Sequence, residues 1–459
     1  QAFRLTACLV EPFASMAKRF TSLLPPLSFG RSLVLLLVSL FCFITALSSK
    51  ASASPLSDRI SVQPEAIASQ IEELGRLSDT EPPSITRILY SENDVRAREY
   101  VKGLMTKAGL TVREDAIGNI YGRLEGEDSS LAPVVSGSHT DAIPQSGKYD
   151  GVLGVLGAVE ALKAIKESGV RVRRSVEALM FTSEEPTRFG LSCIGSRAMC
   201  GRLDASTLDS LSDSNGTSFL DACHSAGYGK KMSTAEILKA SFIPKGDIHA
   251  FVELHIEQGP LLEAEELDIG VVTAIAAPAS LAIDLQGNGG HAGALLMPYR
   301  KDAGLAASEI ALAVEASALG TGVIDTVATT GVLEIYPGAV NSVPREAQVG
   351  IDVRDIDEER RDAVLNKIIQ DAEAITKRRD VGMNYKIVNQ DPPAPCADHV
   401  VQAVQTSADE LGYSSMKMVS RAYHDALFMA QIAPTGMSSA SSHQYTSSLL
   451  SSPLLSSPL

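Results

Sequence analysis

The sequence has no tryptophan, and aromatic residues make up only 5% of its 459 residues. It therefore offers little of the stacking surface on which proteins hold bases or sugars. Positive charge is also scarce, since 40 Lys and Arg face 55 Asp and Glu, which gives a net charge of −15. Nucleic-acid-binding proteins carry a basic surface, so we expect no nucleic-acid partner.

The six cysteines include no Cys-x-x-Cys pair. Such pairs are typical of structural zinc sites, and dense cysteine spacing is typical of disulfide frameworks, so both are disfavoured. A chain of this length exceeds what one hydrophobic core normally supports. We expect two packed domains.

The one long apolar run, residues 33–47, follows Arg31 and precedes the small residues Ala51 to Ala53. It is shorter than the ~20 apolar residues of a membrane-spanning helix, and this pattern is typical of a signal peptide. We expect residues 1–57 to be a leader cleaved near Ala53, no permanent membrane span, and a location in the secretory pathway, in the endoplasmic reticulum. An uncleaved anchor is the alternative.

Residues 58–270 alternate strand-like and helix-like patterns, which predicts an α/β domain with a mostly parallel sheet. Three apolar runs end in reactive polar residues: PVVSGSH (133–139), VEALMFTSEE (176–185) and AFVELHIE (250–257). Ligands of open α/β sheets bind at the carboxyl ends of the strands. The first part of a catalytic domain is therefore expected here, with its site at these strand ends.

Residues 271–390 follow a different pattern, β-α-β-β-α-β, which predicts an inserted ferredoxin-like α+β domain. The expected strands are 281–285, 326–335, 347–353 and 383–388, and the expected helices are 299–319 and 357–379. The Pro-rich stretch 391–395 then leads into the second part of the catalytic domain, residues 391–437, in which helices are expected over 400–411 and 424–432. From Ser438 to the end, the composition is mostly Ser, Leu and Pro, and we expect residues 438–459 to be a disordered, aberrant tail.

The strand ends carry the residue types of a binuclear metal site. These are His139 in GSHTDA, Asp150 in GKYDGV, the pair Glu184-Glu185, and His255 in ELHIEQG. Two imidazoles and several carboxylates can hold two ions when one carboxylate bridges them.

The adjacent carboxylates Glu184 and Glu185 repel each other unless a cation holds them. One can ligate a metal while the other accepts a proton from water. A solvated acidic loop is the alternative, but it leaves unexplained why the pair directly follows a buried apolar run. Asp141, two residues after His139, is expected to orient the imidazole of that ligand.

These segments, with GNGGHAGA, NSVPREAQVGIDVRDID and SRAYHDALFMA, resemble the di-metal amidohydrolases related to aminoacylases, a family that includes allantoate amidohydrolases. The resemblance covers about residues 85–437. It implies that His139, Asp150, Glu185 and His255 ligate two divalent ions, with Asp150 bridging and Glu184 as general base. It also implies manganese as the metal, with zinc possible, and a homodimer formed through the inserted lid domain.

The resemblance further implies a small acyclic ureide as substrate. The matching substrate-binding positions are Gln258, His291, Asn341, Arg354, Tyr423 and His424. A guanidinium is a natural partner for a substrate carboxylate. Allantoate-cleaving members tend to have a small residue where this chain has Tyr423, which favours the shorter substrate ureidoglycolate. Allantoate, N-carbamoyl amino acids and a non-catalytic homologue are the alternatives.

The tail departs from the family pattern, in which a histidine beyond residue 437 completes the second metal site. His443 is the only histidine left, and it comes a few positions early in a Ser-rich stretch. We therefore expect this chain to bind at most one ion tightly and to have little or no activity.

Overall fold

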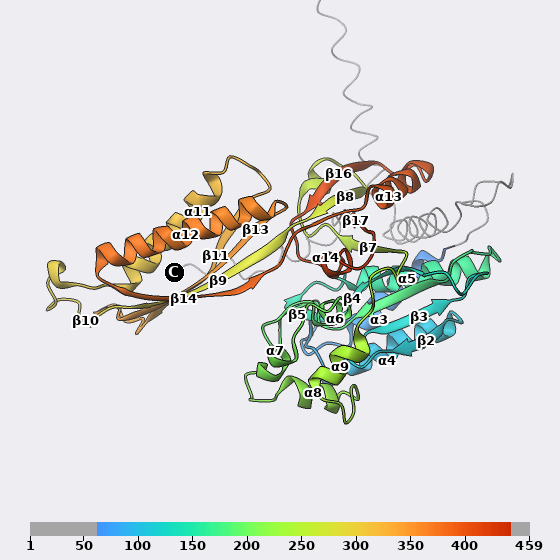
Figure 1. Ribbon diagram of the computed structural model, residues 1–459, viewed down its shortest axis with the longest axis horizontal. Coiled ribbons are helices and arrows are strands. Elements are labelled where there is room, and N and C mark those ends of the chain that lie inside the picture. The colour runs from blue at the N-terminus through green and yellow to red at the C-terminus, as the bar shows by residue number, and fades with distance from the viewer. Residues whose placement is uncertain (1–61, 442–459) are drawn as a thin grey trace, which may run out of the picture. The chain divides into compact units, whose positions relative to one another are not determined.

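The computed structural model describes residues 62–441 (Figure 1). The expected leader and the residues after 441, with His443, lie outside this range. No helix among the described residues is both long and apolar enough to cross a membrane. They form two compact units: unit 1 contains residues 62–271, 402–416 and 437–441, and unit 2 contains 272–401 and 417–436. The inserted domain was expected over residues 271–390, whereas unit 2 begins at residue 272 and also includes residues 391–401 and 417–436.

Unit 1 is built on a sheet with the strand order β17-β7-β4-β6-β3-β2. The strands are β2 (Thr111–Glu114), β3 (Ile120–Leu124), β4 (Val134–His139), β6 (Val176–Phe181), β7 (Ala250–Ile256) and β17 (Thr435–Ala440). Strand β4 lies between β6 and β7 and runs parallel to both, whereas β3 is antiparallel to β6 and β2 to β3. A short antiparallel pair, β1 (Ile85–Arg87) and β5 (Ala142–Ser146), completes the strands of this part.

The helices of unit 1 are α3 (Pro64–Gly75), α4 (Glu92–Lys107), α5 (Val152–Glu167), α6 (Ile194–Met199), α7 (Ala205–Ser210), α8 (Phe219–Ser225), α9 (Thr234–Ser241) and α10 (Leu261–Ala264). Helix α4 begins at a capping serine, because the Ser91 hydroxyl accepts a hydrogen bond from the Asp94 backbone N–H at 3.2 Å. Helix α5 is apolar on nearly all sides and is buried along most of its length. Along the chain it lies between β4 and β6. Because it packs against these strands, it fixes the position of the loop that precedes it.

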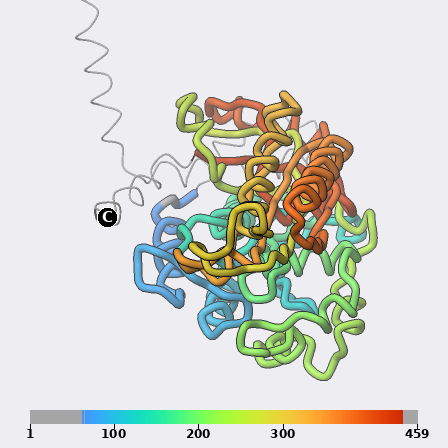
Figure 2. The backbone as a smooth tube through the Cα atoms, turned by 90° about the vertical axis from the view of Figure 1, so that its left-hand side faces the viewer, coloured from blue at the N-terminus to red at the C-terminus, as the bar shows by residue number. Residues whose placement is uncertain are grey.

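Unit 2 contains the expected β-α-β-β-α-β order. Its elements are β9 (Ala277–Gln286), β10 (Gly290–His291), η3 (Met297–Tyr299), α11 (Ala303–Leu319), β11 (Val327–Tyr336), β12 (Ser342–Val343), β13 (Glu346–Asp355), α12 (Glu358–Arg379), β14 (Gly382–Gln390) and α14 (Asp425–Met429). Helices α11 and α12 lie side by side on one face of the antiparallel sheet β11-β13-β9-β14 (Figures 1 and 2). The alternate residues of β9 and β13 that face these helices form a continuous apolar core.

The remaining elements lie near the positions at which the chain passes from one unit to the other. Strand β8 (Ile269–Ile275) pairs with β15 (Ala394–Pro395) and with β16 (Ser415–Ser420), and helix α13 spans Asp398–Glu410.

The fold class predicted from the sequence, a mostly parallel α/β domain with a ferredoxin-like insert, is confirmed. Two local expectations are wrong. The helix expected over 424–432 is shorter and is α14, and Ser438 to Ala440 belong to the buried strand β17 rather than to a disordered tail.

Candidate metal centre and catalytic site

Three of the expected metal ligands form a cluster at the carboxyl ends of two neighbouring strands. His139 is the last residue of β4, His255 lies near the end of β7, and Asp150 lies just before α5. One potential ligand atom from each lies within 4.8 Å of the other two. Asp150 Oδ1 is 3.2 Å from His255 Nε2, and both imidazoles are buried. A divalent ion can be held by all three side chains with little rearrangement.

A glycine allows the start of α5 to approach this cluster. Gly151 has φ +63°, and a Cβ atom added there would lie 2.4 Å from the His139 ring. Any side chain would therefore push the ring away and would also be strained by the left-handed backbone. The Asp150-Gly151 pair therefore places a carboxylate beside the two imidazoles.

Glu184 and Glu185 enter the same site from the turn that follows β6. Glu184 Oε2 is 3.8 Å from His139 Nε2. The turn includes Ser183 at φ +57°, a conformation that a non-glycine residue adopts only when its surroundings enforce it. One carboxylate of the pair thus lies directly beside an expected metal ligand.

Asp141 contacts both His139 and the turn that carries Glu184 and Glu185. Its carboxylate accepts hydrogen bonds from the backbone N–H groups of Glu184, at 3.2 Å, and Glu185, at 2.9 Å. It is the backbone carbonyl of Asp141 that lies 3.0 Å from His139 Nδ1, while its carboxylate is 3.6 Å away. Asp141 therefore contacts the imidazole of His139 at Nδ1, as expected, and does so through its backbone carbonyl. This contact orients the imidazole and leaves Nε2 of His139 for a metal.

The carboxylates around the cluster shift the pKa values of both histidines upward. Burial alone would lower the pKa of His139, but its hydrogen bond to Asp141 and the charge of Glu184 raise that pKa well above its ordinary value. Burial also opposes the charge of His255, whereas the hydrogen bond and charge of Asp150 raise the pKa of His255. The site therefore stabilises positive charge in its interior.

The pKa values of Glu185 and Asp150 are shifted in opposite directions by their surroundings. Burial raises the pKa of Glu185 to about 7. Burial also opposes ionisation of Asp150, but its contacts with His255 hold the pKa of Asp150 below its ordinary value. The buried oxygen and nitrogen donors match the ligands that divalent ions such as Mn²⁺ and Zn²⁺ take from proteins. The residues fit a metal centre.

Gln258, expected to bind substrate, lies against the metal ligands. Its Nε2 donates hydrogen bonds to both carboxylate oxygens of Asp150, at 2.9 and 3.0 Å. Its backbone is also left-handed, with φ +56°. The side chain is exposed, so it can contact a molecule bound next to Asp150.

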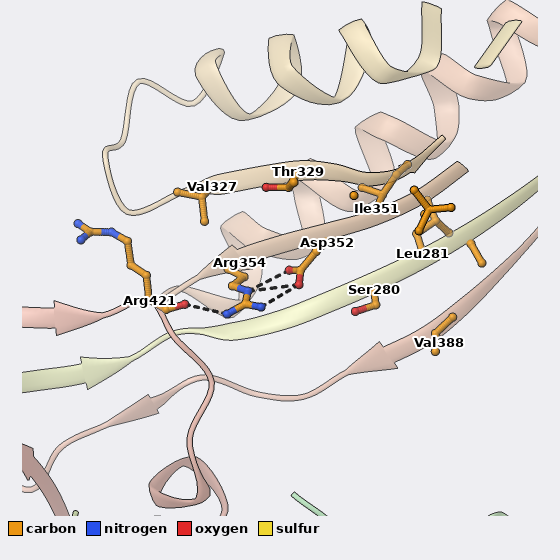
Figure 3. Close-up of a pocket in the computed structure, with 13 residues that line it drawn as sticks. Ser280, Leu281, Val327, Thr329, Ile351, Asp352, Arg354, Val388 and Arg421 are labelled. Atoms are coloured by element: carbon orange, nitrogen blue, oxygen red, sulfur yellow. Dashed lines mark hydrogen bonds and ion pairs between the residues drawn. The ribbon is translucent and has the colours of Figure 1, made fainter. Parts of the chain in front are cut away.

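The other expected substrate residues lie in unit 2. Arg354 on β13 lines a cavity of about 620 Å³ on the sheet face opposite α11 and α12 (Figure 3). Its Nε and Nη2 contact the Asp352 carboxylate at 3.0–3.3 Å, and its Nη1 donates to the Arg421 carbonyl at 3.1 Å. The guanidinium is thus half-buried and already oriented, with a carboxylate of this chain where a substrate carboxylate would compete.

Tyr423 and His424 follow Arg421 directly. The Tyr423 hydroxyl donates to Asp391 Oδ2 at 2.5 Å, and its ring packs edge-on against Phe428. His424 is buried at the start of α14, with Nε2 2.9 Å from the Ser420 hydroxyl. The two side chains are fixed by neighbours in their own unit.

His291 and Asn341 lie together in a different part of unit 2. They are adjacent because β10 pairs with β12, and the Ala292 N–H donates to the Asn341 carbonyl at 2.9 Å. Both side chains are exposed. Strand β10 follows the end of β9, whereas Arg354 pairs with Pro278 near the start of β9 (Figure 1). The structure therefore separates the expected substrate residues of unit 2 into two groups.

A comparison with known protein families identifies the family of this chain. Residues 135–448 match the family described as peptidase family M20/M25/M40, and this span covers the metal cluster and all of unit 2's described residues. The chain belongs to this family. It is therefore a metal-dependent hydrolase of M20 type, as the resemblance in the sequence implied.

Individual M20 relatives cover most of the chain. A ureidoglycolate hydrolase of Oryza sativa subsp. japonica is 56% identical over 378 residues, which are 82% of this chain and 78% of the rice protein. A ureidoglycolate hydrolase of Arabidopsis thaliana is 54% identical over 83% of this chain and 80% of its own length. Solved structures of AtUAH in complex with glyoxylate and with (S)-hydroxyglycine are 53% identical, with a TM-score of 0.78 over 84% of this chain and 92% of theirs.

Some contacts of this M20 site were not foreseen. The Cys193 thiol lies 3.9 Å from Glu184 Oε1, and Cys193 also has a left-handed backbone. Asn119, which contacts the turn before Glu184, was missed as well. Neither residue stands next to a recognisable motif, so only tertiary structure reveals its place.

Proposed function

We propose that the site of this chain is built to hydrolyse ureidoglycolate at a ureido C–N bond, with release of glyoxylate, ammonia and carbon dioxide. The expectation of little or no activity rests on the residues around His443, outside the described range, and stays a separate prediction. The observation that carries the proposal is the preformed His139, Asp150 and His255 cluster, with Glu184 beside it, in a chain more than half identical to two plant ureidoglycolate hydrolases. Cleavage of that bond leaves hydroxyglycine, which loses ammonia to become glyoxylate. Both are the molecules named in the AtUAH complexes.

A divalent metal, when bound, supplies Lewis acidity that polarises the carbonyl and lowers the pKa of a water molecule. His139, Asp150, Glu185 and His255 would hold it. Glu184 would accept the proton of the attacking water and deliver it to the leaving nitrogen, because its carboxylate is buried and lies next to His139. Arg354 would bind the substrate carboxylate in place of Asp352.

The two glutamates give the decisive test of this mechanism. Glu184→Gln should lower the rate of ureidoglycolate cleavage about 10²–10⁴-fold while metal is retained, because only the proton acceptor is removed. Glu185→Gln should instead weaken metal binding. Single-turnover measurements with enzyme in excess detect even low activity, and metal analysis of both variants supplies the control. Loss of metal in Glu184→Gln with retention in Glu185→Gln would reverse the two roles.

The substrate itself is tested by direct competition among three ureides. Ureidoglycolate should be cleaved faster than allantoate and faster than an N-carbamoyl amino acid under the same conditions. A faster reaction with either of the other two would move the chain to that activity. No turnover of any of them by metal-loaded protein would favour the non-catalytic alternative, against which the intact Glu184 and ligand set argue.

We also propose that the working enzyme is a homodimer formed through unit 2. His291 lies beyond the end of β9, and Arg354 pairs with Pro278, eight residues before the last residue of β9. At ~3.3 Å per residue this is a separation of about 26 Å, too far for one small ureide to contact both. A second copy can supply the missing group. The segment after β10 supports such an interface, because Leu296, Met297 and Tyr299 are 62–68% exposed.

Manganese is proposed as the physiological ion and the endoplasmic reticulum as the location. Activity restored by Mn²⁺ but not by Zn²⁺ to metal-free protein would support the first. The second rests on the signal-like run in residues 33–47. Asn215, in the sequence Asn-Gly-Thr, is exposed, so a glycosidase-sensitive change in mass would support secretory entry. A cytosolic protein that still begins at Met16, the first methionine of the sequence, would contradict it.

A further inference from the structure

The turn that carries Glu184 and Glu185 is tied to a segment that follows it in the sequence. Three backbone hydrogen bonds join the two stretches: Gly195 N–H to Thr182 O at 2.7 Å, Ile194 N–H to Ser183 O at 2.9 Å, and Cys193 N–H to Glu184 O at 2.9 Å. The left-handed Ser183 lies in the middle of this turn. Strain of this kind persists only where the surroundings over-determine the backbone.

Asn119 forms hydrogen bonds both with the turn and with the segment that anchors it. It is fully buried in the loop before β3. Its Oδ1 accepts a hydrogen bond from the Thr182 N–H at 2.9 Å, and its Nδ2 donates to the Gly195 carbonyl at 3.3 Å. Gly195 permits this approach, since a Cβ atom there would lie 2.2 Å from Asn119 Oδ1. One amide therefore contacts the turn and its anchoring segment together.

The orientation of that amide is fixed by Asp115. Asn119 Nδ2 donates to Asp115 Oδ2 at 2.8 Å, while Asp115 Oδ1 accepts from the backbone N–H groups of Gly118 and Asn119, at 2.9 and 2.8 Å. A carboxylate can only accept from an amide nitrogen, so Asn119 must present its oxygen to Thr182. Asn119 must therefore donate through Nδ2 and accept through Oδ1 to hold the two segments together.

We propose that Asn119 is a positioning residue for the metal centre and for the general base. Its amide holds the Thr182–Glu185 turn in the left-handed conformation that directs Glu184 and Glu185 into the cluster. Asp141 holds the same turn from the other side, through the two N–H groups of the glutamates. The roles of Glu184 as base and of Glu185 as ligand rest on the proposed function, but Mn²⁺ binding can be measured without any turnover.

Removal of the Asn119 amide distinguishes a positioning role of this residue from a packing role. Asn119→Ala should weaken Mn²⁺ binding at least tenfold, because loss of a group that orients a metal ligand costs about 10–100-fold in metal affinity. Single-turnover kcat should fall about 10²-fold with KM nearly unchanged, as expected for a displacement of the base by about 1 Å. Calorimetric titration of the metal-free protein with Mn²⁺ measures the first effect.

Ser241→Ala is the matched control. Ser241 is equally buried, and its hydroxyl accepts a hydrogen bond from the Ile117 N–H at 3.1 Å, in the same loop as Asn119 but without contact to the turn. This variant should lower the unfolding temperature while its Mn²⁺ affinity stays within twofold of the parent chain. A similar loss of affinity in both variants would reduce Asn119 to a packing residue.

Two more variants keep the proposal testable if Asn119→Ala does not fold. Asn119→Asp retains the acceptor for Thr182 but loses the donor to Gly195 and places a second buried carboxyl group against Asp115, so Mn²⁺ binding should weaken at least threefold. In Gly195→Ala the added Cβ atom would lie 2.2 Å from Asn119 Oδ1 and 2.7 Å from the Thr182 backbone nitrogen, so it displaces both partners of this contact and should weaken Mn²⁺ binding at least tenfold. Parent-like affinity in Asn119→Ala, or in Gly195→Ala if the first is unfolded, overturns the proposal. Absence of ureidoglycolate turnover in the parent chain would overturn only the proposed function.

Discussion

Arg98→Met should destabilise unit 1 by about 3–5 kcal/mol, the usual cost of removing one partner of a buried ion pair. Arg98 and Asp94 are almost fully buried, and Arg98 Nε donates to Asp94 Oδ2 at 2.8 Å. The guanidinium also donates to the Gly118 carbonyl at 2.8 Å, and its carbon lies 5.5 Å from the centroid of the Tyr90 ring and 5.3 Å from that of the Tyr228 ring. Methionine preserves much of the volume but leaves a carboxylate without its countercharge.

Thermal unfolding of metal-free protein measures the effect. A change of 1 kcal/mol shifts the midpoint of a unit of this size by about 2–4 °C, so the expected decrease is about 6–20 °C. The double variant Asp94→Leu with Arg98→Met should recover part of the loss, because the unpaired carboxylate is then also gone. A decrease below about 2 °C, or a double variant no more stable than Arg98→Met, would refute the reasoning.

Three further predictions concern the site. Arg354→Lys should raise KM for ureidoglycolate about 10–100-fold, because a point charge cannot replace a forked contact with a carboxylate, and unchanged steady-state kinetics would remove Arg354 from the site. Tyr423→Gly should shift the ratio of allantoate to ureidoglycolate cleavage towards allantoate, and a constant ratio in a competition assay would exclude Tyr423 as the discriminator. Mn²⁺ binding at pH 7 should release protons, since the pKa of His139 is raised and that of Glu185 is about 7. Affinity should therefore rise as the pH increases through 7; calorimetry in buffers of different ionisation enthalpy counts the protons, and a count of zero contradicts the prediction.

The periodic parts of the chain could be predicted from sequence because local patterns dominate there. Strand and helix periods in residues 271–390 gave the order of unit 2, and observed bounds differ from the expected ones by a few residues. Strand ends carrying His139 and His255 also indicated the site, since adjacent parallel strands bring their ends together. These inferences depend on the backbone and on simple alternation.

Contacts across the fold could not be predicted in this way. The run through Glu185 looks like one strand, but β6 ends at Phe181 because Ser183 turns into a left-handed conformation that nothing in the local sequence requires. The role of Asn119 depends on an approach between residues more than sixty positions apart. Ser438 looks like part of a low-complexity tail, yet its small side chain suits the buried strand β17. Composition does not report the neighbours of a residue.

The separation of His291 from Arg354 along unit 2 makes the two active centres of the proposed dimer genetically interdependent. A chain that lacks one of these groups and a chain that lacks the other would each be inactive alone, but their heterodimer would contain one intact centre and one doubly defective centre. Random pairing of equal amounts would restore about a quarter of the centres. Two defective alleles of this gene could therefore complement each other in one cell.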